Sequence, residues 1–160
     1  PLFRSRLVTM LRNIIKGKPG RSATKYLSGI SKSDYSGQRI LLVEDNELNR
    51  EIAKEIIEMT GAIVDTAENG KEAVEKVMDT PDDYYRLVFM DIQMPVMNGY
   101  EAAAAIRGLD DKKKASIPIV AMTANAFAED IMLAKNAGMN EHMAKPLDIN
   151  KLNETLRKWL

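Results

Sequence analysis

The chain has 160 residues, of which 45% are hydrophobic and 29% are charged, a composition typical of a soluble globular domain. The lack of cysteine excludes disulfides and thiolate metal sites, and it fits a reducing cytoplasm, which we take as the expected location. No apolar run is long enough to cross a bilayer, so we expect no membrane contact from this segment.

The net charge of zero hides an asymmetry between two parts of the chain. Residues 1–37 carry eight basic side chains and one acid, whereas residues 38–160 carry 15 basic and 22 acidic side chains. Opposite charges of this size indicate two units. The basic segment lacks the interleaved aromatics or helix-turn-helix of a nucleic-acid binder, so we interpret it as a solvated helix and linker.

From residue 39 onward, continuous apolar runs alternate with segments of helical periodicity. The predicted strands are 39–43, 63–67, 87–90, 117–122 and 141–144, and the predicted helices are 47–60, 71–79, 100–107, 126–137 and 148–160. Five alternating pairs predict an α/β fold with a doubly wound, five-stranded parallel sheet covered on both faces. The second helix is expected to bury Val74, Val77 and Met78, and the lysine run at 112–114 to form a solvated loop.

Polar side chains follow four of the predicted strands. They are Glu44 and Asp45 after the first strand, Asp91 after the third, Thr123 and Ala124 after the fourth, and Lys145 after the fifth. Ligands of such sheets bind beyond the carboxyl ends of the strands, so we expect these residues to share one rim. Clustered carboxylates repel one another unless a cation lies between them, and all-oxygen ligation with open water positions suits Mg²⁺.

Asp91 is the best candidate for a nucleophile, because it ends the central strand and a carboxylate can attack phosphorus to form an aspartyl phosphate. The equatorial oxygens of the transferred group then need neutralising by Mg²⁺, the Lys145 ammonium, the Thr123 hydroxyl and backbone donors near Ala124. The turn after Asp91 can also bring the Gln93 carbonyl to the metal.

Four segments of the chain resemble the signature points of the response-regulator receiver family, in order and at the right intervals. They are Val43-Glu-Asp-Asn46, Asp91-Ile-Gln-Met-Pro-Val-Met-Asn-Gly99, Met122-Thr-Ala124 and Lys145-Pro146. The resemblance covers residues 38–160 and implies the flavodoxin-like (βα)5 receiver fold. The wording of the motifs is most similar to receivers of hybrid sensor histidine kinases, which implies a parent kinase that can be membrane-anchored.

By this resemblance, Glu44 and Asp45 bind magnesium, Asp91 accepts phosphate and Lys145 contacts the phosphoryl group. Thr123 would be the switch hydroxyl. The resemblance further implies a histidine kinase domain or a histidine phosphotransfer protein as phosphodonor, and self-association through the face formed by the fourth helix, fifth strand and last helix.

His142, the only histidine, takes the position of the family's rotating switch side chain, which is usually aromatic. We interpret it as a packing or switch residue rather than a phosphodonor, because no kinase histidine box surrounds it.

The first residues of the chain repeat the pattern of its last helix. Pro1-Leu2, Leu7, Leu11 and Arg12 align with Pro146-Leu147, Leu152, Leu156 and Arg157 at a constant offset. Residues 1–16 are therefore predicted to be the terminal helix of a preceding receiver-like module. Residues 17–37 are predicted to be a linker, and residues 38–160 the receiver.

Three other functions are weighed against a phosphorelay receiver. A magnesium-dependent phosphatase would carry a general acid two residues after its nucleophile, where this chain has Gln93. A degenerate receiver that acts only as a binding module would be expected to lack an acid or the lysine, and none is missing. A stand-alone response regulator is also compatible with the sequence, although the 160 residues show no output domain.

Overall fold

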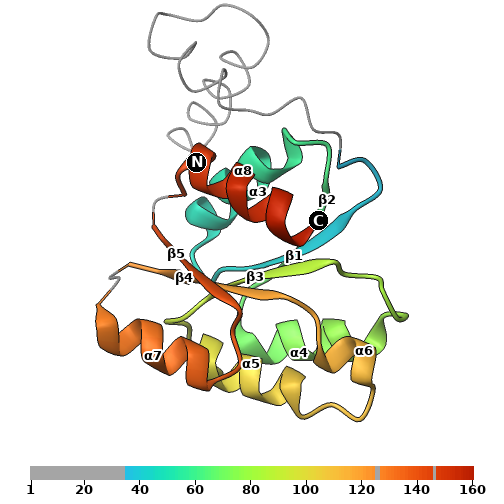
Figure 1. The fold of residues 1–160 in the computed structure, drawn as a ribbon, viewed down its shortest axis with the longest axis vertical. Coiled ribbons are helices and arrows are strands. Elements are labelled where there is room, and N and C mark those ends of the chain that lie inside the picture. The colour runs from blue at the N-terminus through green and yellow to red at the C-terminus, as the bar shows by residue number, and fades with distance from the viewer. Residues whose placement is uncertain (1–34, 125–126, 146) are drawn as a thin grey trace, which may run out of the picture.

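The computed structural model describes residues 35–124, 127–145 and 147–160, which form a doubly wound α/β domain (Figure 1). Its parallel sheet has the strand order β2-β1-β3-β4-β5. The strands are β1 (Arg39–Val43), β2 (Ile63–Ala67), β3 (Leu87–Asp91), β4 (Ile119–Thr123) and β5 (Glu141–Ala144). The predicted five-stranded parallel sheet is therefore confirmed. The predicted N-terminal helix at 1–16 lies outside the described residues.

Helices cover both faces of the sheet, as Figure 1 shows. They are α3 (Glu47–Glu58), α4 (Gly70–Asp79), α5 (Gly99–Arg107), α6 (Lys112–Ala115), α7 (Ala128–Asn136) and α8 (Ile149–Trp159). One core lies between the sheet and α3 with α8, and includes Ile57, Phe89 and Leu156. The other lies between the sheet and α4, α5 and α7, and includes Met90 and Ile106. Two buried faces explain why the strands read as continuous apolar runs.

Short polar side chains set where most of these helices begin. In α3, α4, α5, α6 and α8, a backbone N–H of the first turn donates to a side-chain oxygen of the residue that precedes the helix. These capping residues are, in the same order, Asn46, Asn69, Asn98, Asp111 and Asp148. Such a cap satisfies a backbone donor that the helix cannot pair. The cap at Asp111 also turns the lysine run at 112–114 into one turn of helix, where a loop was predicted.

Two other sequence predictions were wrong in detail. The fourth strand begins at Ile119 rather than residue 117, because Pro118 has no N–H to donate to a ladder, although its carbonyl still accepts from Val88. The Met78 side chain, expected to be buried, is 51% exposed. The burial of Val77 is confirmed, with Ala73 one turn before it on the inner face of α4, and Val74 is partly buried against the same core.

The described domain begins inside the segment predicted to be a linker. Tyr35 packs against the core under α3 and α8, and its N–H donates to the Thr60 carbonyl at 3.3 Å. Gln38 in turn donates to the Tyr35 carbonyl at 3.0 Å, so residues 35–38 form a turn into β1. Within the described residues, no helix is long and apolar enough to span a membrane.

Candidate functional site

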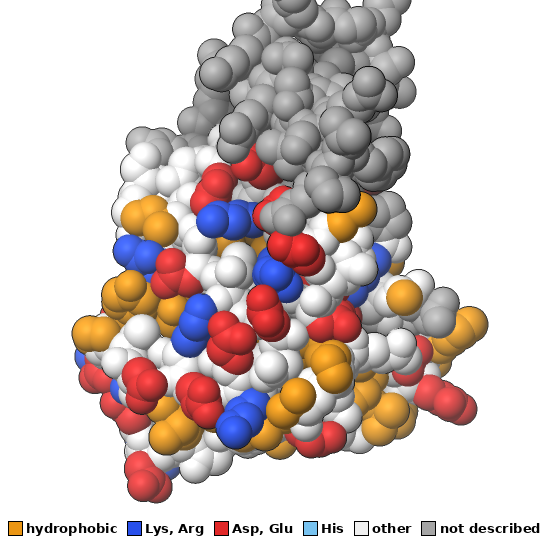
Figure 2. All heavy atoms as spheres, turned by 180° about the vertical axis from the view of Figure 1, so that it is seen from behind, with side chains coloured by type: hydrophobic (Ala, Val, Ile, Leu, Met, Phe, Trp, Pro, Cys, Tyr) orange, Lys and Arg blue, Asp and Glu red, His pale blue; other side chains and the backbone are white. Residues whose placement is uncertain are grey.

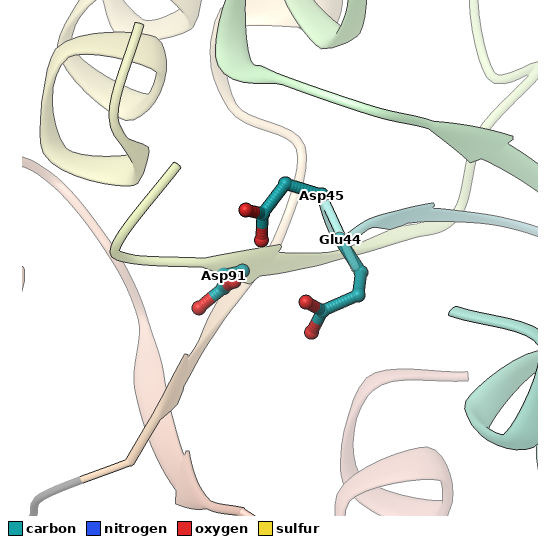
Figure 3. Close-up of side chains that lie close together, drawn as sticks. All are labelled: Glu44, Asp45 and Asp91. Atoms are coloured by element: carbon teal, nitrogen blue, oxygen red, sulfur yellow. The ribbon is translucent and has the colours of Figure 1, made fainter. Parts of the chain in front are cut away.

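Three carboxylates meet at the carboxyl edge of the sheet (Figure 3). Glu44 and Asp45 directly follow β1, and Asp91 is the last residue of β3. One carboxylate oxygen from each residue can be chosen so that the three lie within 4.8 Å of one another. Glu44 and Asp91 are only 3% and 4% exposed, whereas Asp45 is exposed to solvent.

The topology brings these acids together. Strand β1 lies between β2 and β3, so the chain passes from β1 to β2 on one side of β1 and then crosses to β3 on its other side. This is the switch point of a doubly wound sheet, where the loops diverge and leave room for a ligand. The register pairs Val43 with Met90, which places Glu44 and Asp91 at the same level.

Lys145 joins two of the three acids. Its Nζ lies 2.8 Å from Glu44 Oε2 and 2.9 Å from Asp91 Oδ1. The Lys145 N–H donates to the Thr123 carbonyl at 2.8 Å, which ties the lysine to the end of β4. One ammonium among three carboxylates leaves excess negative charge, and this excess favours a divalent cation.

Burial raises the pKa of Asp91 to about 6. The hydrogen bond from Lys145 opposes this rise, while the neighbouring Glu44 adds to it. Burial alone would lower the pKa of Lys145, but its hydrogen bonds to Glu44 and Asp91 outweigh burial and raise it. Lys145 therefore stays charged, and a proton competes with any cation for Asp91 near neutral pH.

The loop after Asp91 folds back tightly on its own strand. The Gly99 N–H donates to the Ile92 carbonyl at 2.9 Å, and a Cβ at Gly99 would lie 2.3 Å from the Asp91 carbonyl oxygen. Only glycine allows this approach of the start of α5 to the phosphoacceptor candidate. The sequence motif contained Gly99, but its steric role becomes visible only in the structure.

The remaining predicted site residues lie around this cluster at different distances from it. Thr123 is the buried last residue of β4, and Ala124 lines a hollow with Glu44 and Lys145. Gln93 is exposed and lines a second hollow that includes Asp45.

His142 lies apart from the acids, half-buried on β5 and paired with Ala121 of β4. Ala121 belongs to the core on the α7 side of the sheet. Since side chains alternate along a strand, Thr123 projects to the same side as Ala121, toward α7. The predicted roles of these residues in transfer and switching stay predictions.

The donor set fits a magnesium ion. All three candidate ligands are carboxylates, which are the hard oxygen donors that Mg²⁺ prefers. The exposed Asp45 leaves one side of the cluster open to solvent, as an ion that keeps several waters requires.

Comparison with known proteins agrees with this site. Residues 40–157 match the response regulator receiver domain, and the chain belongs to this family. It is 42% identical over 123 residues to the two-component response regulator ORR41 of Oryza sativa subsp. japonica, covering 76% of this chain and 93% of that protein. It is 35% identical over 124 residues to the hybrid signal transduction histidine kinase L of Dictyostelium discoideum, covering 76% of this chain but only 7% of the kinase.

Solved receiver structures are similar in fold. The receiver domain of a sensor histidine kinase from Pseudomonas aeruginosa PAO1, with a magnesium ion coordinated in its active site cleft, is 35% identical. The match has a TM-score of 0.69 and covers 78% of this chain and 98% of that one. A receiver domain from Saccharomyces cerevisiae, solved with a histidine phosphotransfer protein, is 32% identical with a TM-score of 0.68, covering 76% and 88%. The chain is thus a two-component signal transduction receiver with an acidic pocket of the kind that can hold Mg²⁺.

Proposed function

We propose that this domain accepts a phosphoryl group on Asp91 within a phosphorelay, with a phosphohistidine as donor. A carboxylate oxygen of Asp91 attacks phosphorus, the phosphorus–nitrogen bond of the donor breaks, and its electron pair returns to the imidazole, which takes up a proton. The observation that carries the proposal is the placement of Asp91. It is buried at the end of β3, with Lys145 Nζ at 2.9 Å and two further acids beside it.

The other site residues support this step. Glu44, Asp45, Asp91 and the Gln93 carbonyl would hold Mg²⁺, which supplies charge neutralisation for the transferred group when bound. Lys145 contacts the Asp91 carboxylate, so after transfer its ammonium can contact the phosphoryl oxygens, which then carry the negative charge. We assign the Thr123 hydroxyl and the Ala124 N–H to the same oxygens, because Thr123 ends β4 beside Lys145 and Ala124 directly follows it.

Intact-mass measurement tests the phosphoacceptor. The protein is incubated with Mg²⁺ and acetyl phosphate, and the wild type is expected to gain the mass of one phosphoryl group. Asp91→Asn should gain none, because an amide oxygen is too weak a nucleophile. Asp130→Asn is the matched control, since Asp130 lines the hollow beside Asp45 but lies outside the acid cluster. Full labelling of Asp91→Asn would refute the assignment.

We further propose that the chain is the receiver of a hybrid sensor histidine kinase in the cytoplasm, whose parent protein can be membrane-anchored. The repeat of the last helix in residues 1–16 supports this context, since it resembles the end of a preceding receiver-like module. A chain starting at Tyr35 should keep its fold and accept phosphate, because the packing of the described domain includes Tyr35. A large fall in melting temperature on this truncation would show that the removed residues belong to the receiver's core.

We propose that the binding partner of this domain is a protein rather than a nucleic acid. In the face drawn in Figure 2, acidic and basic side chains of the described residues are interspersed, which gives nucleic acid no single-sign stripe to follow. The yeast receiver solved with a histidine phosphotransfer protein supports a partner of that class.

Self-association through α7, β5 and α8 is a second proposed contact. Phe127, Met132 and Leu133 on or beside α7 are 67%, 65% and 52% exposed and would gain from burial there.

We propose that Thr123 couples phosphorylation to this α7–β5–α8 face. Its hydroxyl moves toward the phosphoryl group, and His142 on the neighbouring strand takes the space that it leaves. A ligand shifts such an equilibrium only through its different affinity for the two states, and Thr123 supplies part of that difference. Thr123→Ala should therefore still accept phosphate but show smaller amide shift changes around His142 on adding beryllofluoride. Undiminished changes in this variant would rule out coupling through Thr123.

A further inference from the structure

An arginine on the first turn of α3 holds the backbone that carries two of the three acids. Arg50 Nη1 donates to the Glu44 carbonyl at 2.9 Å and to the Asp45 carbonyl at 3.4 Å, so its hydrogen bonds go to main-chain oxygens rather than to the carboxylates of these two residues. Arg50 Nη2 lies 3.4 Å from Glu68 Oε1, just beyond β2. The Arg50 side chain is 13% exposed although it lies on an outer helix.

The loop between β1 and α3 is thus fixed from several sides. The Glu44 N–H donates to the Ala67 carbonyl at 3.1 Å, and the Asn46 N–H donates to Glu44 Oε1 at 3.2 Å. These two bonds do not use the main-chain carbonyls of Glu44 and Asp45. The guanidinium of Arg50 donates to both of these carbonyls and so fixes the loop from a further side. Because the carbonyl directions fix the peptide planes, they also fix where the two side chains leave the backbone.

The two cations near the site therefore act on different atoms. Lys145 contacts the carboxylate oxygens themselves, which a metal would also need. Arg50 contacts main-chain carbonyls and leaves the carboxylate oxygens of Asp45 for the metal. By charge alone, a cation beside a Mg²⁺ site lowers its affinity for the ion. By geometry, a group that orients metal ligands raises that affinity, and its loss typically costs 10–100-fold.

We infer that Arg50 is a positioning residue for the metal site: its guanidinium holds the Glu44–Asp45 backbone so that both carboxylates face Asp91. The inference rests on the proposed function, because it concerns the Mg²⁺ site that phosphoryl transfer would use. This positioning role and simple charge repulsion predict opposite effects of an Arg50 substitution on Mg²⁺ affinity. Removal of this positive charge weakens Mg²⁺ binding, whereas charge repulsion alone would make the same substitution tighten it.

The test is a Mg²⁺ titration followed by amide NMR shifts, on the full chain, for wild type, Arg50→Ala, Arg50→Met and Arg50→Lys. The methionine variant keeps the apolar part of the side chain and so protects the packing of α3. We expect the dissociation constant for Mg²⁺ to rise about tenfold in the alanine and methionine variants. Lysine should not restore affinity, because a single ammonium cannot reproduce the planar fork across two carbonyls and Glu68. The metal-free amide shifts of residues 44–46 should change in all three.

Lys54→Ala is the matched control, since it removes one positive charge from the same helix, and the ion pair that Lys54 forms within the described part of the chain is with Glu58 at 3.8 Å, away from the loop. Its Mg²⁺ affinity should equal that of the wild type. Equal or tighter Mg²⁺ binding in Arg50→Met, or full restoration by Arg50→Lys, would overturn the inference and leave the proposed function intact. If the wild type itself neither bound Mg²⁺ nor gained phosphoryl mass, the proposed function would fail and the inference with it.

Discussion

The buried Asp91 carboxylate should destabilise the metal-free protein at neutral pH, and Asp91→Asn should remove that cost. The pKa of Asp91 is about 6 in the folded protein, against 3.8 for an ordinary aspartate. A carboxyl whose folded pKa is raised contributes stability that is fully present below its unfolded pKa and is lost as the pH rises through the folded pKa. A shift of this size corresponds to about 3 kcal/mol at pH 7.5, and most of it is absent at pH 4.

Urea unfolding followed by far-UV circular dichroism measures this difference in buffers that contain EDTA. We expect Asp91→Asn to exceed the wild type in free energy of unfolding by about 3 kcal/mol at pH 7.5, and the gap to close toward pH 4. Titrating groups that do not interact with Asp91 act equally on both proteins, so their effects cancel in the comparison. The asparagine can still accept the hydrogen bond from Lys145, whose second carboxylate, Glu44, is unchanged.

Magnesium should reverse the ranking at pH 7.5. An ion at 1,000 times its dissociation constant stabilises the protein that binds it by about 4.1 kcal/mol, which exceeds the gap of about 3 kcal/mol, and Asp91→Asn should gain much less. Asp79→Asn makes the same chemical change on the exposed end of α4, so its stability should stay within about 0.5 kcal/mol of the wild type. An Asp91→Asn protein no more stable than the wild type in EDTA at pH 7.5, or a gap independent of pH, would refute the reasoning.

Three further substitutions test other parts of the structure. Asp45→Ala should weaken Mg²⁺ binding at least tenfold in an NMR titration, because it removes the exposed carboxylate of the proposed metal site. Arg107→Ala should lower the free energy of urea unfolding by about 3 kcal/mol, because the guanidinium of Arg107 donates at 2.8 Å to the Gly138, Ala115 and Ile117 carbonyls and to the Asn140 side chain. Gly99→Ala should both lower the melting temperature and slow labelling by acetyl phosphate, since its Cβ would collide with the Asp91 carbonyl.

The sequence predicted the sheet well because each strand is buried on both faces. A run such as residues 39–43 has no polar alternation to confuse with a helix, and the observed β1 has the predicted bounds. Errors occurred where the residue types alone do not decide the outcome. Met78 and Val77 are equally apolar, so only the rotation of α4 against the sheet decides which of them is buried.

The acid cluster could also be predicted, because every member follows a strand. A parallel sheet brings the carboxyl ends of its strands to one edge, so Glu44, Asp91 and Lys145 could be placed together without coordinates. Arg50 could not be found in this way. Its partners at the site are backbone carbonyls, which every residue carries, so its contacts leave no signature in the residue types.

The charges of the cluster suggest why neutral donors are needed after transfer. Glu44, Asp45 and Asp91 with Lys145 leave two negative charges, which one Mg²⁺ would balance. In the proposed reaction the Asp91 carboxylate becomes an acyl phosphate that carries up to one more negative charge than before. No further cation among the described residues contacts these carboxylates, so the added charge must be stabilised by hydrogen-bond donors. Thr123 ends the strand next to Asp91, and drawing its hydroxyl inward would turn a local charge imbalance into a movement on the α7 side of the sheet.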